Sequence, residues 1–174
     1  MLRHTRPKIA DGICYGQTDL DLTEPFEQEA EAVAIALPEI QQIFSSPLQR
    51  CRRLADYIAA KRRLSVTLDD RLAELNFGAW EGQAWDQIHR PDLEAWADDF
   101  YHACPHGGEA VADLKRRVDD AVRAVRPHSG NTLLVTHAGV VRAAFANGTN
   151  AEQFQTPIDF GQFIELPAHE DLNV

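Results

Sequence analysis

The chain has 174 residues, of which 44% are hydrophobic and 25% are charged, and its formal net charge is −10. This size and balance are typical of one globular domain, expected over residues 1–174, and an acidic chain is a poor partner for nucleic acid. A local cluster of Arg and His can still attract a small anion. Three widely spaced cysteines make a disulfide framework or a zinc site unexpected and favour a reducing, cytoplasmic location. No apolar run approaches the ~20 residues of a membrane span, and the first residues do not resemble a signal peptide.

Helical and strand-like segments alternate along the chain. Strands are expected over residues 1–3 (very short), 41–46, 64–70, 131–137 and 161–166. Helices are expected over residues 25–37 with Thr23 as N-cap, 47–62 with Ser46 as N-cap, 109–125 and 138–146, with two short helices between 84 and 100. Residues 7–21 and 71–82 are expected to form loops. The alternation predicts an α/β domain with a mostly parallel sheet.

Polar residues stand where three of these strands end. The three sets are Arg3 with His4, Ser45 and Ser46 with Arg50 one turn into the next helix, and Thr136 with His137. Ligands gather at the carboxyl ends of strands in open α/β sheets. If these strands are neighbours, two arginines and two histidines meet at one point. Arginine forks and helix N-termini both bind phosphate, so the set fits a dianionic phosphate that a neutral imidazole can attack.

Each of these features also has an ordinary interpretation. An Arg-His pair near a terminus is usually a surface tail, and SSPLQR reads equally as a capped helix with a solvated arginine. A histidine after an apolar strand can be a core residue. The combination, in this order, is far more specific than any one member.

With these residues in place, the chain resembles the histidine phosphatase superfamily, which has the phosphoglycerate-mutase-like fold. Its four motifs are matched in order by LRHT (Arg3, His4), SPLQR (Arg50), LAELNFGAWEG (Glu74) and THAG (His137). The resemblance covers nearly the whole chain. It implies a three-layer α/β/α sandwich with a mostly parallel central sheet.

Within that family, the segment GICYGQTDLDLTE resembles the alpha-ribazole phosphatase branch. This resemblance implies removal of phosphate from alpha-ribazole 5′-phosphate during assembly of the cobalamin nucleotide loop. The mutases of the family carry an insertion where only about thirty residues separate Glu74 from the PHGGEA turn here, which favours a phosphatase. A broad-specificity phosphatase, a phosphoglycerate-mutase-like enzyme and a sugar bisphosphatase stay open. A non-catalytic binder of phosphorylated ligands and a general interaction module are further alternatives, which the complete set of catalytic residue types argues against.

The resemblance also implies roles for single residues. His4 would attack phosphorus and become a phosphohistidine, while Arg3, Arg50 and His137 bind the non-bridging oxygens. Glu74 would protonate the leaving oxygen and then activate water, so it must carry a proton when substrate binds. The arginines supply the positive charge, so no metal or other cofactor is expected.

Substrate contacts and partners complete the set of expectations. Tyr15, Gln17 and Thr18 are candidate substrate-binding residues, with simple turn or loop-packing roles as the alternative. The expected partner is a small phosphorylated substrate, with no nucleic acid and no membrane, and a homodimer is left open.

Two positions depart from the family pattern. Thr5 stands where relatives usually have Gly, so a left-handed backbone there would be strained unless this branch uses a different φ. Only Met1 and Leu2 precede the Arg-His pair. Either the first strand is very short or the natural chain begins upstream.

Overall fold

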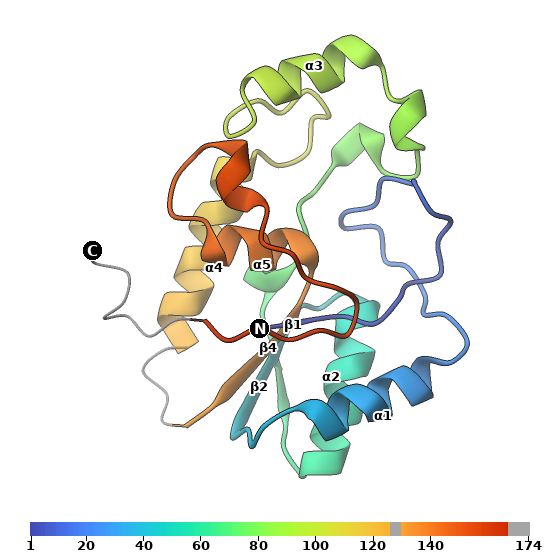
Figure 1. Cartoon of the computed structure of the whole chain (residues 1–174), viewed down its shortest axis with the longest axis vertical. Helices are drawn as coiled ribbons and strands as arrows, with labels where there is room; N and C mark the ends of the chain where they lie inside the picture. Colours follow the sequence, from blue (N-terminus) through green and yellow to red (C-terminus); the bar gives the residue numbers. More distant parts are fainter. Residues whose placement is uncertain (126–129, 167–174) are drawn as a thin grey trace.

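The sheet at the centre of the molecule has four parallel strands in the order β1-β4-β2-β3 (Figure 1). The computed structural model describes residues 1–125 and 130–166. Its strands are β1 (Leu2–Arg3), β2 (Gln42–Ser45), β3 (Val66–Leu68) and β4 (Thr132–Thr136). Among the strands of this sheet, the short β1 pairs with β4, and β2 lies between β4 and β3. The predicted parallel sheet is confirmed.

Helices cover both faces of this sheet. On one face lie α1 (Phe26–Ala36) and α2 (Gln49–Arg62), and on the other lie α4 (Val111–Val125) and α5 (Ala138–Phe145) (Figure 1). The predicted three-layer α/β/α arrangement is therefore confirmed. The helix α3 (Arg90–Asp98) lies beyond the carboxyl ends of the strands, at the top of Figure 1. The described residues also form four short 3₁₀ helices: η1 (Asp70–Leu72), η2 (Gly78–Trp80), η3 (Trp85–Gln87) and η4 (Ala151–Phe154).

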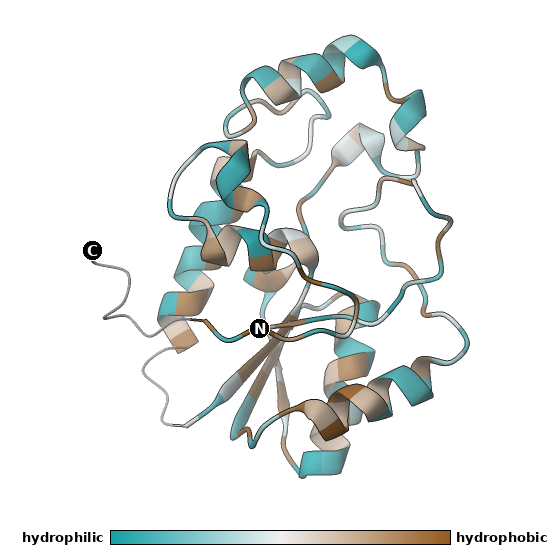
Figure 2. Ribbon diagram, viewed as in Figure 1, coloured by the Kyte–Doolittle hydropathy of each residue, from teal (hydrophilic) through white to brown (hydrophobic). Residues whose placement is uncertain are grey.

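The strand β4 shows how the sequence builds two cores from one strand. Side chains alternate between the faces of a strand, so Leu133 and Val135 pack with α1 and α2 while Leu134 packs with α4 and α5. All three are buried. Figure 2 shows the strands mostly in the colours of hydrophobic residues, with hydrophilic residues along the outer faces of the helices. A strand buried on both faces is typical of a parallel sheet between helices.

Some local expectations were wrong. Pro25, not Thr23, occupies the N-cap position of α1, and the Thr23 hydroxyl instead donates to the Arg6 carbonyl at 3.2 Å. The helix α2 begins two residues later than expected, although Ser46 Oγ does accept from the Leu48 backbone N–H at 3.3 Å. Residues 161–166 make one antiparallel bridge, Leu2 to Phe163, rather than a strand, because β1 offers only two residues to pair with.

The backbone at Thr5 is not left-handed. Within the described ranges, Arg63 is the one residue other than glycine with positive φ, at 56°, so Thr5 replaces Gly without left-handed strain.

The helices of this same part of the chain are too short or too polar to cross a bilayer.

Candidate active site at the carboxyl ends of three strands

The strand order places the three polar strand ends side by side. In the register of the sheet, Arg3 of β1 lies opposite Thr136 of β4, and Ser45 of β2 lies opposite Val135 of β4. The residues that follow, His4, His137 and Ser46, therefore lie at the same edge. The rings of His4 and His137 are 5.1 Å apart between centroids. The convergence that the sequence predicted is confirmed, and it follows from the parallel order β1-β4-β2.

His4 is held as a neutral imidazole with one free nitrogen. It is buried, and its Nδ1 lies 2.6 Å from the carbonyl oxygen of Thr5. Because a carbonyl only accepts, Nδ1 carries the proton and Nε2 keeps its lone pair. Burial and the nearby Arg50 guanidinium, followed by that of Arg3, lower the pKa of His4 to about 3, although the bond to Thr5 opposes them. An imidazole of this kind has the protonation state that a nucleophile needs.

His137 is fixed by two buried neighbours. The Nε of Arg50 donates to its Nδ1 at 3.3 Å, so Nε2 carries the proton and donates to Ser46 Oγ at 2.8 Å. Burial, then the neighbouring His4 and Arg50, lower the pKa of His137 well below its usual value. The ring can therefore donate a hydrogen bond from Nε2 while staying neutral. Arg50 and His137 are both fully buried.

The thiol of Cys51 also lies close to His137, with Sγ 3.4 Å from Nε2. Burial raises the pKa of this thiol far above its usual value. A protonated thiol is a weak nucleophile. His4 is therefore the better-placed nucleophile of the two.

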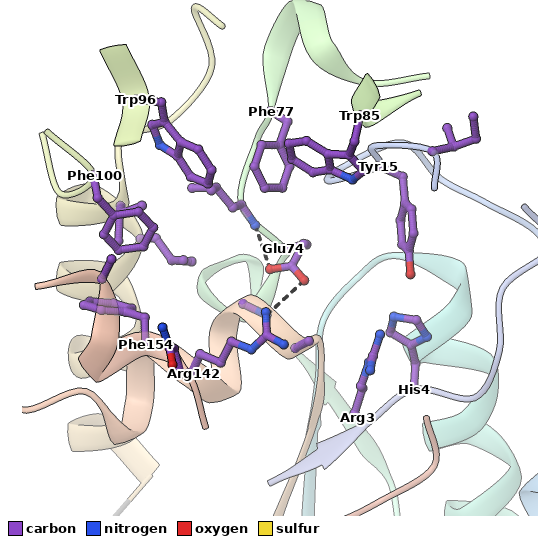
Figure 3. A pocket seen from close by; sticks show the side chains of 18 residues that line it. Arg3, His4, Tyr15, Glu74, Phe77, Trp85, Trp96, Phe100, Arg142 and Phe154 are labelled. Carbon is purple, nitrogen blue, oxygen red and sulfur yellow. Dashed lines mark hydrogen bonds between the residues drawn. The ribbon is translucent and has the colours of Figure 1, made fainter. Parts of the chain in front are cut away.

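Glu74 faces the same space from the loop after η1 (Figure 3). Its carboxylate accepts from the backbone N–H of Leu75 at 3.0 Å and from that of Gly139, in the first turn of α5, at 3.1 Å. A Cβ added at Gly139 would lie 2.2 Å from Glu74 Oε1. The glycine of the THAG motif therefore allows the carboxylate to approach the helix, and the two bonds hold it in place.

A cavity of about 510 Å³ lies beside His4 and Glu74, whereas Arg50 and His137 are not among the residues that line it. Arg3, His4, Tyr15 and Glu74 line its polar side, and Arg142 of α5 also reaches it. Burial lowers the pKa of Arg3, and the nearby Tyr15 and Glu74 partly offset this lowering. Aromatic side chains line much of the remaining surface of the cavity, as Figure 3 shows: Phe77, Trp85, Trp96, Phe100 and Phe154. We call these five residues the aromatic roof. The cavity thus has a polar floor at the strand ends and an apolar roof.

The candidate substrate contacts divide into two groups. Tyr15 lines the cavity and lies 5.5 Å from Arg50, measured from its ring centroid to Cζ. Gln17 and Thr18 are not among the lining residues. The Gln17 amide donates to the Glu74 carbonyl at 3.0 Å, and the Thr18 hydroxyl donates to the Glu81 carboxylate. Their contact with substrate stays a prediction.

Glu81 and Arg142 were missed by reasoning from the sequence. Glu81 accepts from the backbone N–H groups of Gln17, Thr18 and Phe77 at 2.9, 2.7 and 3.0 Å. Glu81 is the Glu of the WEG motif, and that motif was the signal in the sequence that could have identified it. Arg142 follows His137 by five residues in a helix, a spacing that gives no direct indication of a shared cavity.

Metal ligands are a separate question. Among residues 1–125 and 130–166, no three His, Cys, Asp or Glu side chains are grouped so that they could hold a metal ion. Metal-independent chemistry stays a prediction that chelation can test.

Known proteins resemble this chain over most of its length. The chain is 28% identical over 137 residues to phosphoserine phosphatase 1 of Hydrogenobacter thermophilus, covering 75% of this chain and 65% of that protein. It is 35% identical over 130 residues to a probable phosphoglycerate mutase, GpmB, of Escherichia coli, covering 70% and 60%. The chain therefore spans less than two thirds of the length of either relative.

Solved structures of phosphatases share the fold. The alpha-ribazole phosphatase of Shigella flexneri superposes with a TM-score of 0.80 at 25% identity, covering 92% of this chain and 85% of that one. A mycobacterial glucosyl-3-phosphoglycerate phosphatase gives 0.77 at 27% identity, covering 88% and 81%. The family model for the histidine phosphatase superfamily (branch 1) matches residues 1–162. With the Arg-His pair and the facing glutamate in one cavity, and the buried second histidine beside His4, the chain belongs to the histidine phosphatase superfamily.

Proposed function

We propose that this chain is a phosphomonoesterase that forms a phosphohistidine on His4. The observation that carries the proposal is the neutral imidazole of His4, whose Nδ1–H is bound to Thr5 and whose Nε2 lone pair is free. It lies in one cavity with Arg3 and Glu74, and its ring is 5.1 Å from that of His137. Nucleophile, cation and acid are thus present together.

The reaction needs two steps. In the first, Nε2 of His4 attacks phosphorus, the bond from phosphorus to the ester oxygen breaks, and Glu74 gives its proton to that oxygen. Arg3, which lines the cavity, binds the phosphoryl oxygens, and the nearby charge of Arg50 adds to the stabilisation. When substrate binds, the Nε2–H of His137 leaves Ser46 Oγ and donates to a phosphoryl oxygen. In the second, Glu74 takes a proton from water, the water oxygen attacks phosphorus, and the electron pair of the N–P bond returns to His4. The products are inorganic phosphate and an alcohol.

Alpha-ribazole 5′-phosphate is the substrate we propose first. Its benzimidazole base is planar and aromatic, and the aromatic roof offers ring faces on which such a base can stack. A structural neighbour is an alpha-ribazole phosphatase. The proposed location is the cytoplasm, where the cysteines, free among the described residues, would stay reduced.

A substrate with an acidic leaving group is the second candidate. Arg142 lines the cavity and its Nε makes one long bond, 3.4 Å, to the Thr156 carbonyl. A carboxylate on the leaving group would bind such a guanidinium. Relatives of this chain are named phosphoserine phosphatase and glucosyl-3-phosphoglycerate phosphatase.

One set of assays tests both activity and substrate. The purified chain is given alpha-ribazole 5′-phosphate, p-nitrophenyl phosphate and 3-phosphoglycerate, each with and without EDTA, and acid-stable and acid-labile phosphate on the protein are measured after rapid quenching. We expect turnover that EDTA leaves unchanged, an acid-labile phosphoenzyme, and loss of both in His4→Ala. Activity retained in His4→Ala would exclude His4 as the nucleophile, and equal low rates on all three esters would exclude the specific substrate.

A further inference from the structure

The two-residue strand β1 is supported from outside the sheet by a segment near the end of the described chain. Gly161, Gln162 and Ile164 run antiparallel to it (Figure 1, dark red beside β1). The Arg3 N–H donates to the Gln162 carbonyl at 3.0 Å, and the Gly161 N–H donates to the His4 carbonyl at 3.1 Å. The main chain of both catalytic candidates is thus held between β4 and this segment. So short a strand makes few ladder bonds of its own.

The same segment holds the side chain of Arg3. Its Nη1 donates to the carbonyl of Ile158 at 2.8 Å. Its Cζ lies 3.7 Å from the centroid of the Phe160 ring, so the guanidinium stacks on that ring. Arg6 also lies over Phe160, at 5.0 Å, and the ring of His4 is 5.6 Å away between centroids. Phe160 therefore contacts both residues of the Arg-His pair.

One buried nitrogen of the Arg3 side chain, Nε, lacks a hydrogen-bond partner among the described residues. A buried N–H without a partner is costly unless a ligand satisfies it. Arg3 lines the cavity beside His4, so an anion bound there would lie next to its guanidinium.

We infer that Phe160 is a positioning residue for the phosphate site: by stacking on Arg3 it holds the guanidinium in one plane beside the cavity where an anion would bind. This inference rests on the proposed phosphatase function of the same site. A long arginine side chain loses rotamer entropy when it is ordered. The stack on Phe160 and the bond to Ile158 order Arg3 before an anion binds, so anion binding does not have to offset this entropy loss. Phe160 itself does not line the cavity, so it acts through Arg3.

The test compares Phe160→Met with Phe160→Tyr in the full chain. Methionine keeps apolar bulk but has no ring face, whereas tyrosine keeps the face. The readouts are the Kd of inorganic phosphate by calorimetry, and kcat and KM with p-nitrophenyl phosphate. For Phe160→Met we expect Kd and KM to rise roughly tenfold, a cation–π stack lost at a partly buried site, with kcat changed by less than about threefold. For Phe160→Tyr we expect values within about twofold of wild type.

The matched control is Phe26→Met, which removes a similar stack, Arg53 over Phe26 at 5.1 Å, away from the cavity. Its phosphate Kd should stay at the wild-type value. Phosphate binding unchanged in Phe160→Met, or weakened as much in Phe160→Tyr, would overturn the inference. If phosphate binding weakens in Phe160→Met as expected but the wild-type chain hydrolyses no ester, the proposed function alone is overturned. If the wild-type chain hydrolyses esters but Phe160→Met leaves the phosphate Kd unchanged, only the inference is overturned.

Discussion

His4 links the stability of the protein to pH through its buried, neutral ring. Its pKa falls to about 3 in the folded chain, from 6.5 in an unfolded one, and the pKa of His137 is lowered as well. Between these values the unfolded chain binds protons that the folded chain does not. Stability contributed by the neutral rings is therefore full above about pH 6.5 and is lost as the pH falls toward 3.

In His4→Gln, we predict that the difference between the numbers of protons bound by the unfolded and the folded chain becomes smaller by about one. The free energy of unfolding, measured by urea titration at intervals between about pH 7 and pH 4.5, should fall less steeply in the variant, by about 1.4 kcal/mol per pH unit well below pH 6.5. His102→Gln, at an exposed position outside the cavity, is the control and should follow the wild-type slope. If wild type and His4→Gln fall equally, His4 is already protonated in the folded protein.

Among the elements of the fold, the loop that carries Tyr15, Gln17 and Thr18 makes hydrogen bonds to both Glu81 and Arg50. Glu81 accepts N–H groups of this loop, and the carbonyls of Gly16 and Thr18 accept from Arg50 at 2.5 and 2.7 Å. Burial raises the pKa of Glu81, but the bonds from Thr18, Gln17 and Phe77 outweigh it, so the pKa lies below its usual value. The carboxylate therefore anchors the loop that orients Arg50, the second arginine of the proposed phosphate site.

We predict that Glu81→Gln lowers kcat/KM about tenfold without unfolding the protein. The amide turns one acceptor oxygen into an NH₂ group facing backbone N–H donors, which costs about 1–3 kcal/mol for an unsatisfied buried group. The control is Glu94→Gln, in the exposed Arg90–Glu94 pair, where such pairs contribute little. Full activity in Glu81→Gln, measured with p-nitrophenyl phosphate, would mean that Arg50 does not depend on this loop.

Sequence patterns predicted the elements of the floor better than those of the roof. Parallel strands end at one edge of a sheet, so apolar runs ending in His4, Ser46 and His137 already implied a shared site. The roof depends instead on contacts between segments far apart in the chain, such as Phe100 of the α3 region with Phe154 of η4, at 5.4 Å between ring centroids. No local periodicity encodes such pairs. The expected last strand failed for a related reason, because its length was set by the two-residue partner β1.

At the scale of the whole molecule, the division into floor and roof separates chemistry from specificity. The floor comes from the end of β1 and from the loops that carry Tyr15 and Glu74, and every phosphate ester would need it. The roof comes from the segments around η2, η3, α3 and η4. Its residues pack on one another, as Phe77 does on Trp85 at 5.5 Å and on Trp96 at 6.2 Å between ring centroids. A change in the roof should therefore alter which ester is accepted more than how fast phosphorus is attacked.

The variant Trp85→Leu tests this separation. Leucine keeps apolar contact with the neighbouring rings but removes a stacking face, and stacking of a base on an aromatic side chain contributes about 1–3 kcal/mol. We predict that KM for alpha-ribazole 5′-phosphate rises roughly tenfold or more, while kcat/KM for glycerol 3-phosphate, which has no ring, changes by less than about twofold. Both constants come from steady-state rates of phosphate release. An equal loss on the two esters would place Trp85 in the support of the catalytic floor, and no loss on either would mean that the leaving group does not reach the roof.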